Sequence, residues 1–371
     1  MIDSRFILLE GMPSTGKTTM ARFLRTQMER NRIDATWIHE IAQPHPLLFF
    51  DEASLTLDEF RRLITAYPQA AEILSRIATV RRSAVGICLT EVEWNYRDAI
   101  GEDAYQALLG HDSLYLPLDR YTAVALEKWE CFVSEALQKR DEVFVVDSAI
   151  FQFQIFTFLL KRGAYEELQH FIDQLAEIIK PLDPCLVFLH REDAEASIAY
   201  LENDRGTEYL EYIWTRDKDY PYYADLPPGA ESFKRFLREY GCFVDRLYQR
   251  FTAQKLSLNV SDGQWIRHED EMLAFLELER IPDPEASPRD GMYINEEHGF
   301  VIEVNGISIV DPNGNTRPLH LKSENEFYVD WIPTILRFEE NKIIIAGSQT
   351  GSRWTTTGLV FRRINPRGGC I

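Results

Sequence analysis

The sequence predicts an α/β domain with a doubly wound parallel sheet, followed by a small antiparallel β-sheet or β-barrel domain. Upstream of Arg280, short apolar strands alternate with longer stretches of helical spacing, and this alternation favours parallel pairing. Downstream of Pro288, short strands alternate with turn signals such as Asp311–Asn315, a pattern typical of antiparallel sheets. Three prolines in the nine residues Arg280–Pro288 indicate a linker. We therefore expect an α/β domain over residues 1–280, a linker over 281–288 and a β-domain over 289–371.

Five apolar runs in the first domain are candidate strands, and the intervals between them carry helical spacing. The runs are Arg5–Glu10, Ala35–His39, Val143–Asp147, Cys185–His190 and Leu256–Val260. Because ligands of doubly wound sheets bind at the carboxyl ends of the strands, functional residues are expected just after these runs. The interval from Pro46 to Glu142 is longer than such a domain needs, and its role stays open. Strand candidates in the β-domain include Val301–Val304, Gly306–Val310, Ile335–Phe338 and Lys342–Ala346.

The first strand leads into a glycine loop that reads GMPSTGKT, and a helix-competent stretch, Thr19–Arg30, follows. This has the form G-x-x-x-x-G-K-[ST] in the order strand, loop, helix, which predicts backbone N–H groups closing around phosphate oxygens. Lys17 would reach the outer phosphates, and the Thr18 hydroxyl would bind Mg²⁺. The alternative is a glycine-rich turn that only caps a helix. The residues expected to contact the nucleotide are Gly11, Met12, Pro13, Ser14, Thr15, Gly16, Lys17, Thr18 and Thr19.

Two other strand ends carry carboxylates. Glu40 follows the second strand, across the cleft from the glycine loop, where it would accept a substrate proton or bind the substrate; otherwise it is a solvated loop residue. His39 and His45 are weaker candidates beside it. Asp147 ends the third strand and fits a residue that holds Mg²⁺ through water or orients the substrate, although an Asp-Ser pair is also a common helix N-cap. Gln152, one turn further on, is expected to face the same cleft.

Cations follow the fourth strand. Arg191 comes directly after it, and a helical pattern then leads to Arg205. Small phosphotransferases carry arginines on a mobile lid in this position, where they neutralise charge on the transferring phosphoryl group. Arg120, Arg216 and Lys218 are further cations, each of which is also explained as a surface residue. We take Arg205 as the lid candidate.

Together, the glycine loop, Glu40, the Asp147-Ser148 pair and the arginine-bearing lid resemble the thymidylate kinase and deoxynucleoside kinase group of P-loop kinases. The resemblance covers roughly residues 5–280. It implies a five-stranded parallel sheet, ATP with Mg²⁺ as the donor and in-line phosphoryl transfer. Lys17 and Thr18 match the phosphate and Mg²⁺ roles, and Glu40 matches the acid that contacts the acceptor.

The chain departs from this group after the third strand. Both kinase types usually carry an arginine there, whereas this chain reads Val146-Asp147-Ser148. The acceptor therefore stays open among a nucleoside, a nucleotide, an antibiotic and another hydroxylated metabolite. The C-terminal region looks like the small lipocalin-like β-domains of some bacterial enzymes, through Gly291-Met-Tyr293, Phe327 and Leu336-Arg-Phe338. For this region we expect a packing, dimerisation or substrate-covering role.

The leading hypothesis is an ATP-dependent kinase in which Lys17, Glu40, Asp147 and Arg205 are catalytic, and Thr18 and Asp147 hold the metal. Its rival is an NTP-binding switch that uses the β-domain to bind a partner. The sequence has no clear water-orienting glutamine and no guanine-reading Asn-Lys-x-Asp stretch, and this argues against the switch.

The net charge and the lengths of the apolar runs argue against two classes of partner, nucleic acids and membranes. The formal charge of −19 argues against a nucleic-acid surface, because phosphate backbones need clustered Lys and Arg. No apolar run approaches the roughly 20 residues that span a bilayer, so no membrane partner is expected. Met1–Arg5 lead straight into the first strand without room for a signal peptide, and the five cysteines are scattered without a C-x-x-C pair. We therefore expect a cytoplasmic protein whose partner is a small-molecule acceptor, with a homodimer through the β-domain left open.

Overall fold

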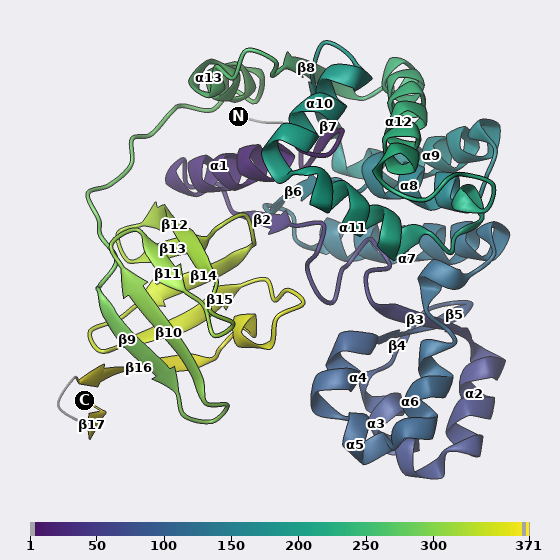
Figure 1. Ribbon diagram of the computed structural model, residues 1–371, viewed down its shortest axis with the longest axis horizontal. Helices are drawn as coiled ribbons and strands as arrows, with labels where there is room; N and C mark the ends of the chain where they lie inside the picture. Colours follow the sequence, from purple (N-terminus) through teal and green to yellow (C-terminus); the bar gives the residue numbers. More distant parts are fainter. Residues whose placement is uncertain (1–3, 366–368, 371) are drawn as a thin grey trace. The chain divides into compact units, whose positions relative to one another are not determined.

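The structure, a computed structural model, describes residues 4–365 and 369–370, which form two compact units (Figure 1). The α/β unit contains the chain up to Glu40 and His45–Arg280. The barrel unit contains the chain from Ile281 onward together with four residues from the first half of the chain, Ile41–Pro44. Ile41 packs against the barrel core, and the Gln43 N–H donates to Gln349 O at 3.0 Å.

The α/β unit is built on a five-stranded, all-parallel sheet with the order β2-β6-β1-β7-β8, which confirms the predicted parallel sheet. The strands are β1 (Phe6–Gly11), β2 (Ala35–Ile38), β6 (Val143–Asp147), β7 (Pro184–His190) and β8 (Gln254–Asn259). The chain leaves β1 toward β2 on one side and leaves β7 toward β8 on the other. Such a reversal of direction opens a crevice at the carboxyl ends of the strands. Leu9 lies level with Asp147, and Gly11 lies level with Leu189.

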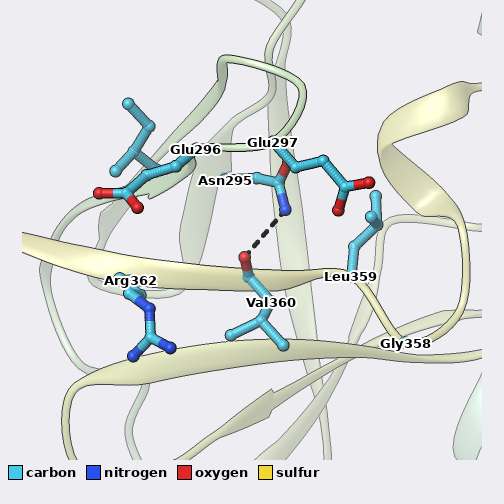
Figure 2. A pocket seen from close by; sticks show the side chains of 8 residues that line it. Asn295, Glu296, Glu297, Gly358, Leu359, Val360 and Arg362 are labelled. Atoms are coloured by element: carbon cyan, nitrogen blue, oxygen red, sulfur yellow. Dashed lines mark hydrogen bonds between the residues drawn. The ribbon is translucent and has the colours of Figure 1, made fainter.

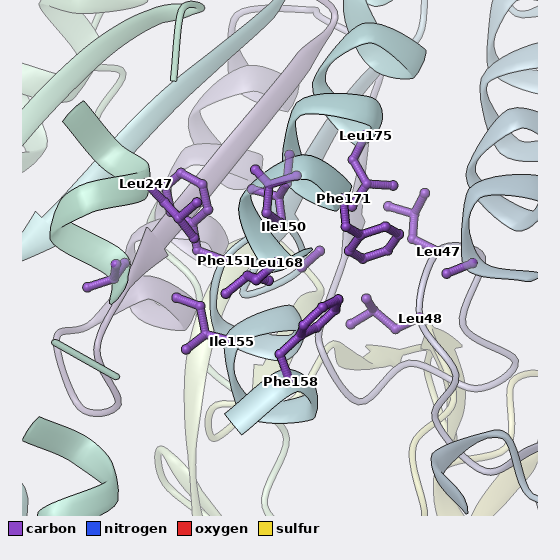
Figure 3. Close-up of a cluster of buried hydrophobic side chains, with 14 of the residues drawn as sticks. Leu47, Leu48, Ile150, Phe151, Ile155, Phe158, Leu168, Phe171, Leu175 and Leu247 are labelled. Carbon is purple, nitrogen blue, oxygen red and sulfur yellow. The ribbon is translucent and has the colours of Figure 1, made fainter. Parts of the chain in front are cut away.

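The α/β unit surrounds this sheet with helices (Figure 1). They are α1 (Lys17–Arg30), α7 (Leu118–Gln138), α8 (Gln152–Leu160), α9 (Tyr165–Ile179), α10 (Ala194–Arg205), α11 (Thr207–Asp217), α12 (Ala230–Arg250) and α13 (Trp265–Phe275). On α9 the buried residues include Leu168, Phe171 and Leu175, which recur at helical spacing. Figure 3 shows Phe171 beside Phe158 of α8, whose rings stack with centroids 5.7 Å apart, and Leu247 of α12 belongs to the same core.

The interval between β2 and α7 forms a small antiparallel sheet of order β3-β5-β4 with short helices and a hydrophobic core of its own. Its elements are β3 (Glu52–Thr56), α2 (Leu57–Ala66), α3 (Ala71–Ile77), β4 (Thr79–Val80), β5 (Ala84–Cys88), α4 (Leu89–Asn95), α5 (Arg97–Ile100) and α6 (Glu102–Leu109). We call this segment the insertion. Short 3₁₀ turns complete the chain at η1 (Pro68–Ala70), η2 (Ser113–Tyr115), η3 (Lys180–Leu182), η4 (Pro221–Tyr223) and η5 (Arg353–Thr355).

The barrel unit is a closed, eight-stranded antiparallel barrel, which confirms the predicted antiparallel β-domain and shows that its sheet closes. Its strands are β9 (Gly291–Asn295), β10 (Phe300–Asn305), β11 (Ser308–Val310), β12 (Thr316–Ser323), β13 (Glu326–Val329), β14 (Thr334–Phe338), β15 (Lys342–Gly347) and β16 (Val360–Asn365), and β17 (Gly369–Cys370) pairs with β16. Pairing of β15 with β16 closes the ring, where Ile343 faces Phe361. Both side chains are buried in the barrel core, which is filled by apolar residues.

Over the described part of the chain, no helix is both long enough and apolar enough to cross a membrane. Cys88, Cys131, Cys185 and Cys242 carry free thiols. The fifth cysteine, Cys370, lies outside the residues whose side chains are described.

Candidate functional site at the carboxyl edge of the parallel sheet

The glycine loop joins β1 to α1 by a turn that only glycine permits at two positions. A Cβ atom on Gly11 would lie 2.1 Å from Leu189 O on the neighbouring strand β7. A Cβ atom on Gly16 would lie 2.5 Å from the Trp265 ring, and Gly16 has a φ of 90°. Gly16 is the N-cap of α1 and supplies no side-chain acceptor, so the first N–H groups of the helix stay available to another acceptor.

Within the described part of the chain, the buried Lys17 side chain and the buried Ser14 hydroxyl of this loop have no charged hydrogen-bond acceptor. Lys17 Nζ donates 2.8 Å to Met12 O, a carbonyl of the same loop, and makes no ion pair among the described residues. Burial lowers the pKa of Lys17, although the nearby carboxylates of Glu40, Glu10 and Asp147 oppose that shift. Ser14 Oγ is buried and has no hydrogen-bond partner. The loop therefore holds polar atoms that a bound ligand would satisfy.

Asp147, the last residue of β6, forms hydrogen bonds with helix α1 and with the segment that follows β2. Its Oδ2 accepts a hydrogen bond of 3.0 Å from Thr18 Oγ1, and its Oδ1 accepts one of 2.9 Å from the Glu40 N–H. The side chain is fully buried, and burial raises its pKa, against the opposing influence of His39. The N-cap of the following helix α8 is Phe151, so Asp147 does not cap that helix.

Glu40 and Gln152 face each other at the same edge. Gln152, the first residue of α8, donates from Nε2 to Glu40 Oε2 at 2.8 Å. Glu40 is half-buried and makes no ion pair among the described residues. Gln152 Oε1 is buried and has no hydrogen-bond partner. The structure thus brings Lys17, Thr18 and Asp147 together with the Glu40–Gln152 pair.

Three further residues at this edge were missed by the sequence analysis. Glu10, fully buried at the end of β1, accepts N–H bonds from Ile150, Phe151 and Gln152 at 2.7, 3.0 and 3.1 Å, which fixes the start of α8. Tyr240 of α12 donates from its hydroxyl to Gly11 O at 3.1 Å. Trp265 lies against Gly16. Glu10 could have been identified from the sequence, because it is a charged residue near the end of an otherwise apolar strand. No local sequence pattern identifies Tyr240 or Trp265 as residues of this edge.

The two histidines near Glu40 have different surroundings. His39 is fully buried, lies 5.1 Å from the Trp37 ring and belongs to the electrostatic environment of Asp147. His45 Nδ1 accepts the N–H groups of Leu47 and Leu48 at 3.0 and 2.8 Å, so it organises its own loop.

Among the predicted cations, Arg205 acts electrostatically on Lys17 and lowers its pKa. It ends α10, is about half exposed and stacks on Tyr209 at 4.8 Å. The other arginines are engaged elsewhere: Arg191 stacks on Tyr200, Arg216 forms a bidentate pair with Asp217, and Arg120 pairs with Glu59 of the insertion. Lys218 is exposed beyond the end of α11.

Elsewhere in the described residues, a metal-binding group or a pocket lined by predicted site residues could also mark a functional site. No group of three or more His, Cys, Asp or Glu side chains among them is arranged to hold a metal ion. A pocket of about 250 Å³ lies in the barrel unit between the β9–β10 turn and the segment Gly358–Arg362 (Figure 2). Inside it Asn295 Nδ2 donates to Val360 O at 3.0 Å, and none of the predicted site residues lines it.

Comparison with known proteins adds no family to this description. No protein-family model matches the chain, and no curated protein sequence matches it. The function therefore has to be argued from the residues at the carboxyl edge of the sheet.

Proposed function

We propose that the α/β unit is an ATP-dependent phosphotransferase acting on a small hydroxyl- or phosphate-bearing acceptor, with a nucleoside or nucleotide favoured. The observation that carries the proposal is the convergence of Lys17, Thr18, Asp147 and Glu40 around one glycine loop at the carboxyl edge of a parallel sheet. Phosphoryl transfer needs little covalent chemistry from the protein. It depends on positioning and on charge neutralisation, which these residue types supply.

The donor side fits the phosphates of a nucleotide. The uncapped N-terminus of α1, the buried Ser14 hydroxyl and the Lys17 ammonium are all donors without a strong acceptor. On binding, Lys17 would exchange the Met12 carbonyl for phosphate oxygens, a stronger, charge-assisted partner. Thr18 and Asp147 would hold Mg²⁺, which typically takes one or two protein oxygens together with phosphates and water. When bound, the ion would neutralise charge on the phosphates.

The acceptor side is supplied by Glu40 and Gln152. Glu40 lies beyond the end of β2, and its backbone N–H is held by Asp147, so its position is tied to the donor side. Its carboxylate would accept the hydroxyl proton as the acceptor oxygen forms its bond to the γ-phosphorus and the bond from phosphorus to the ADP oxygen breaks. Arg205, at the end of α10, would close toward the transferring group and offset its negative charge.

The proposal is tested by ADP release from ATP and Mg²⁺ with a panel of nucleosides, nucleoside monophosphates and aminoglycoside- or nucleoside-type antibiotics. We expect a strong rise with one class of acceptor. We also expect Lys17→Ala to lower the rate by about 100-fold to 1000-fold, the loss typical of one charge-stabilising group. Lys180→Ala, which alters an exposed lysine on the 3₁₀ turn after α9, should leave the rate unchanged.

Two outcomes would point elsewhere. An antibiotic as the best acceptor would make the protein an antibiotic-modifying phosphotransferase with the same donor site. Slow ADP release that no acceptor changes would favour an NTPase switch, with the barrel unit as the surface for its partner.

A further inference from the structure

The amide of Gln152 has an orientation that its neighbour dictates. Glu40 Oε2 is a carboxylate oxygen and can only accept, so the atom of Gln152 that meets it at 2.8 Å must be the donor Nε2. The reverse orientation would bring two acceptor oxygens into contact. Gln152 Oε1 therefore faces away from Glu40, and it is buried without a hydrogen-bond partner.

The open hydrogen-bonding positions beside the loop are consequently acceptors. Gln152 Oε1 is one, and the carboxylate of Glu40, which receives a single donor, has further lone pairs. A buried acceptor without a donor costs about 1–3 kcal/mol, so a ligand that brings donors would recover this loss. Ser148, directly after Asp147, adds a hydroxyl that is 1% exposed and unpartnered, and a hydroxyl suits either kind of partner.

Carboxyl groups outnumber cations around these positions. Burial lowers the pKa of Lys17, and the carboxyl groups of Glu40, Glu10 and Asp147 act to raise it. Burial raises the pKa of Tyr240 of α12, and the carboxyl groups of Glu10 and Glu40 raise it further. Lys17 belongs to the loop that would hold the donor phosphates, and Arg205 stands half-exposed at the end of α10. No arginine or lysine pairs with Glu40 among the described residues.

We infer that the acceptor is a neutral or cationic molecule that presents the reacting hydroxyl together with a second O–H or N–H donor and carries no phosphate of its own. The inference rests on the proposed phosphotransferase function and narrows its acceptor. Gln152 Oε1 and the Glu40 carboxylate would accept hydrogen bonds from these two donor groups. Nucleosides and amino sugars meet this description, whereas nucleoside monophosphates do not.

A phosphate-bearing acceptor conflicts with this surface for two reasons. A phosphate monoester carries about −1.5 to −2 charges near neutral pH, and it presents oxygens that mainly accept hydrogen bonds. Beside Glu40 and Gln152 it would therefore meet like charge and leave the open acceptors unsatisfied. Arginine is the side chain best suited to a phosphate ester, because its planar fork bonds two phosphate oxygens, and no arginine of the described residues hydrogen-bonds to Glu40 or Gln152.

The test compares matched acceptors with the full chain. ADP release is measured with each nucleoside against its own 5′-monophosphate, and with each aminoglycoside against its O-phosphorylated form, in the wild type and in Lys17→Ala. We expect Lys17-dependent stimulation by unphosphorylated acceptors, with kcat/KM at least ~10-fold above that of the phosphorylated partner. Equal or better use of the phosphorylated partner would overturn the inference and leave the phosphotransferase assignment standing. Stimulation by no acceptor in any pair would overturn both.

A variant separates a role in recognition from a role in folding. Gln152→Leu keeps the approximate volume and removes both polar atoms, so KM for the preferred acceptor should rise ~10-fold to 100-fold while KM for ATP stays unchanged. Gln249→Leu, an exposed position on α12, is the matched control. An unchanged acceptor KM in a folded Gln152→Leu protein would contradict the inference.

Discussion

Two clusters of buried charged groups in the α/β unit differ in how completely those groups are partnered. In the first, Glu52 of the insertion accepts from Arg81 at 2.7 Å and from Lys128 of α7, and Lys128 also donates to Leu48 O at 2.6 Å. In the second, at the carboxyl edge of the sheet, Lys17 has only a loop carbonyl, and Gln152 Oε1 has no partner. The charged groups of the first cluster are hydrogen-bonded to one another, whereas the second cluster contains buried polar atoms without a hydrogen-bond partner in the described part of the chain.

The difference separates a structural role from a binding role. Burial acts to raise the pKa of Glu52, but Lys128 and Arg81 outweigh it, so the pKa lies below its usual value and the carboxylate stays charged. Each charged group in this cluster has a charged partner within the fold, so the cluster needs no ligand to satisfy it. Open polar atoms carry an energetic cost that only a ligand or water removes. We therefore take incomplete pairing, more than the presence of charge, as the mark of the candidate site.

The largest expected effect compares the two buried lysines. Lys128→Ala should lower the free energy of unfolding by about 1.5–3 kcal/mol, because buried Glu52 loses one of its two charged hydrogen-bond partners and keeps Arg81. Lys17→Ala should change it by less than about 1 kcal/mol, since only the Met12 carbonyl loses a donor. Urea unfolding of both variants, with Lys180→Ala as an exposed control, measures the contrast. Similar losses for Lys17 and Lys128 would remove the distinction between the two clusters.

A smaller effect follows from Glu10 at the site. Burial raises its pKa to about 7, whereas the ordinary value is 4.5. Between these values the folded chain holds a proton that the unfolded chain has lost, so the free energy of unfolding should fall as the pH rises from about 4.5 to 7. The slope is at most ~1.4 kcal/mol per pH unit.

Glu10→Gln cannot ionise and should lose this pH dependence. Urea unfolding between about pH 5 and pH 8 compares it with the wild type and with Glu192→Gln, which changes an exposed residue. The stability of Glu10→Gln relative to the wild type should rise with pH over this range. Parallel stability curves for all three proteins would show that Glu10 titrates as an ordinary carboxyl.

The smallest effect concerns the partly exposed pair of Glu59 and Arg120 in the insertion and α7. The hydrogen bond from Arg120 lowers the pKa of Glu59 to about 2. The pair therefore contributes stability above about pH 4.5, and that contribution is lost as the pH falls toward 2. Because solvent screens the pair, Glu59→Gln should cost less than about 1 kcal/mol near neutral pH. A loss as large as that of Lys128→Ala would show that the insertion depends on this pair as well.

Much of the fold follows from local pattern. The five strands and the helix after the glycine loop follow from apolar periodicity and from glycine spacing, which depend on neighbours a few residues apart. The candidate residues Lys17, Thr18 and Asp147 were found in the same way, because each ends or follows a predicted strand. The sequence could also place Glu40 at a strand end, but its pairing with Gln152, 112 residues later, has no local signature.

The sequence by itself determined the five strands of the parallel sheet, where the glycine loop lies and that an antiparallel domain follows, because these depend on short-range periodicity and on backbone freedom. The tertiary structure decided which distant side chains meet at that loop. Tyr240 and Trp265 reach it from α12 and α13, and Ile41–Pro44 belong to the barrel unit although they follow Glu40 directly. Such contacts depend on long-range packing and on the matching of donors to acceptors, and neither leaves a periodic trace in the chain.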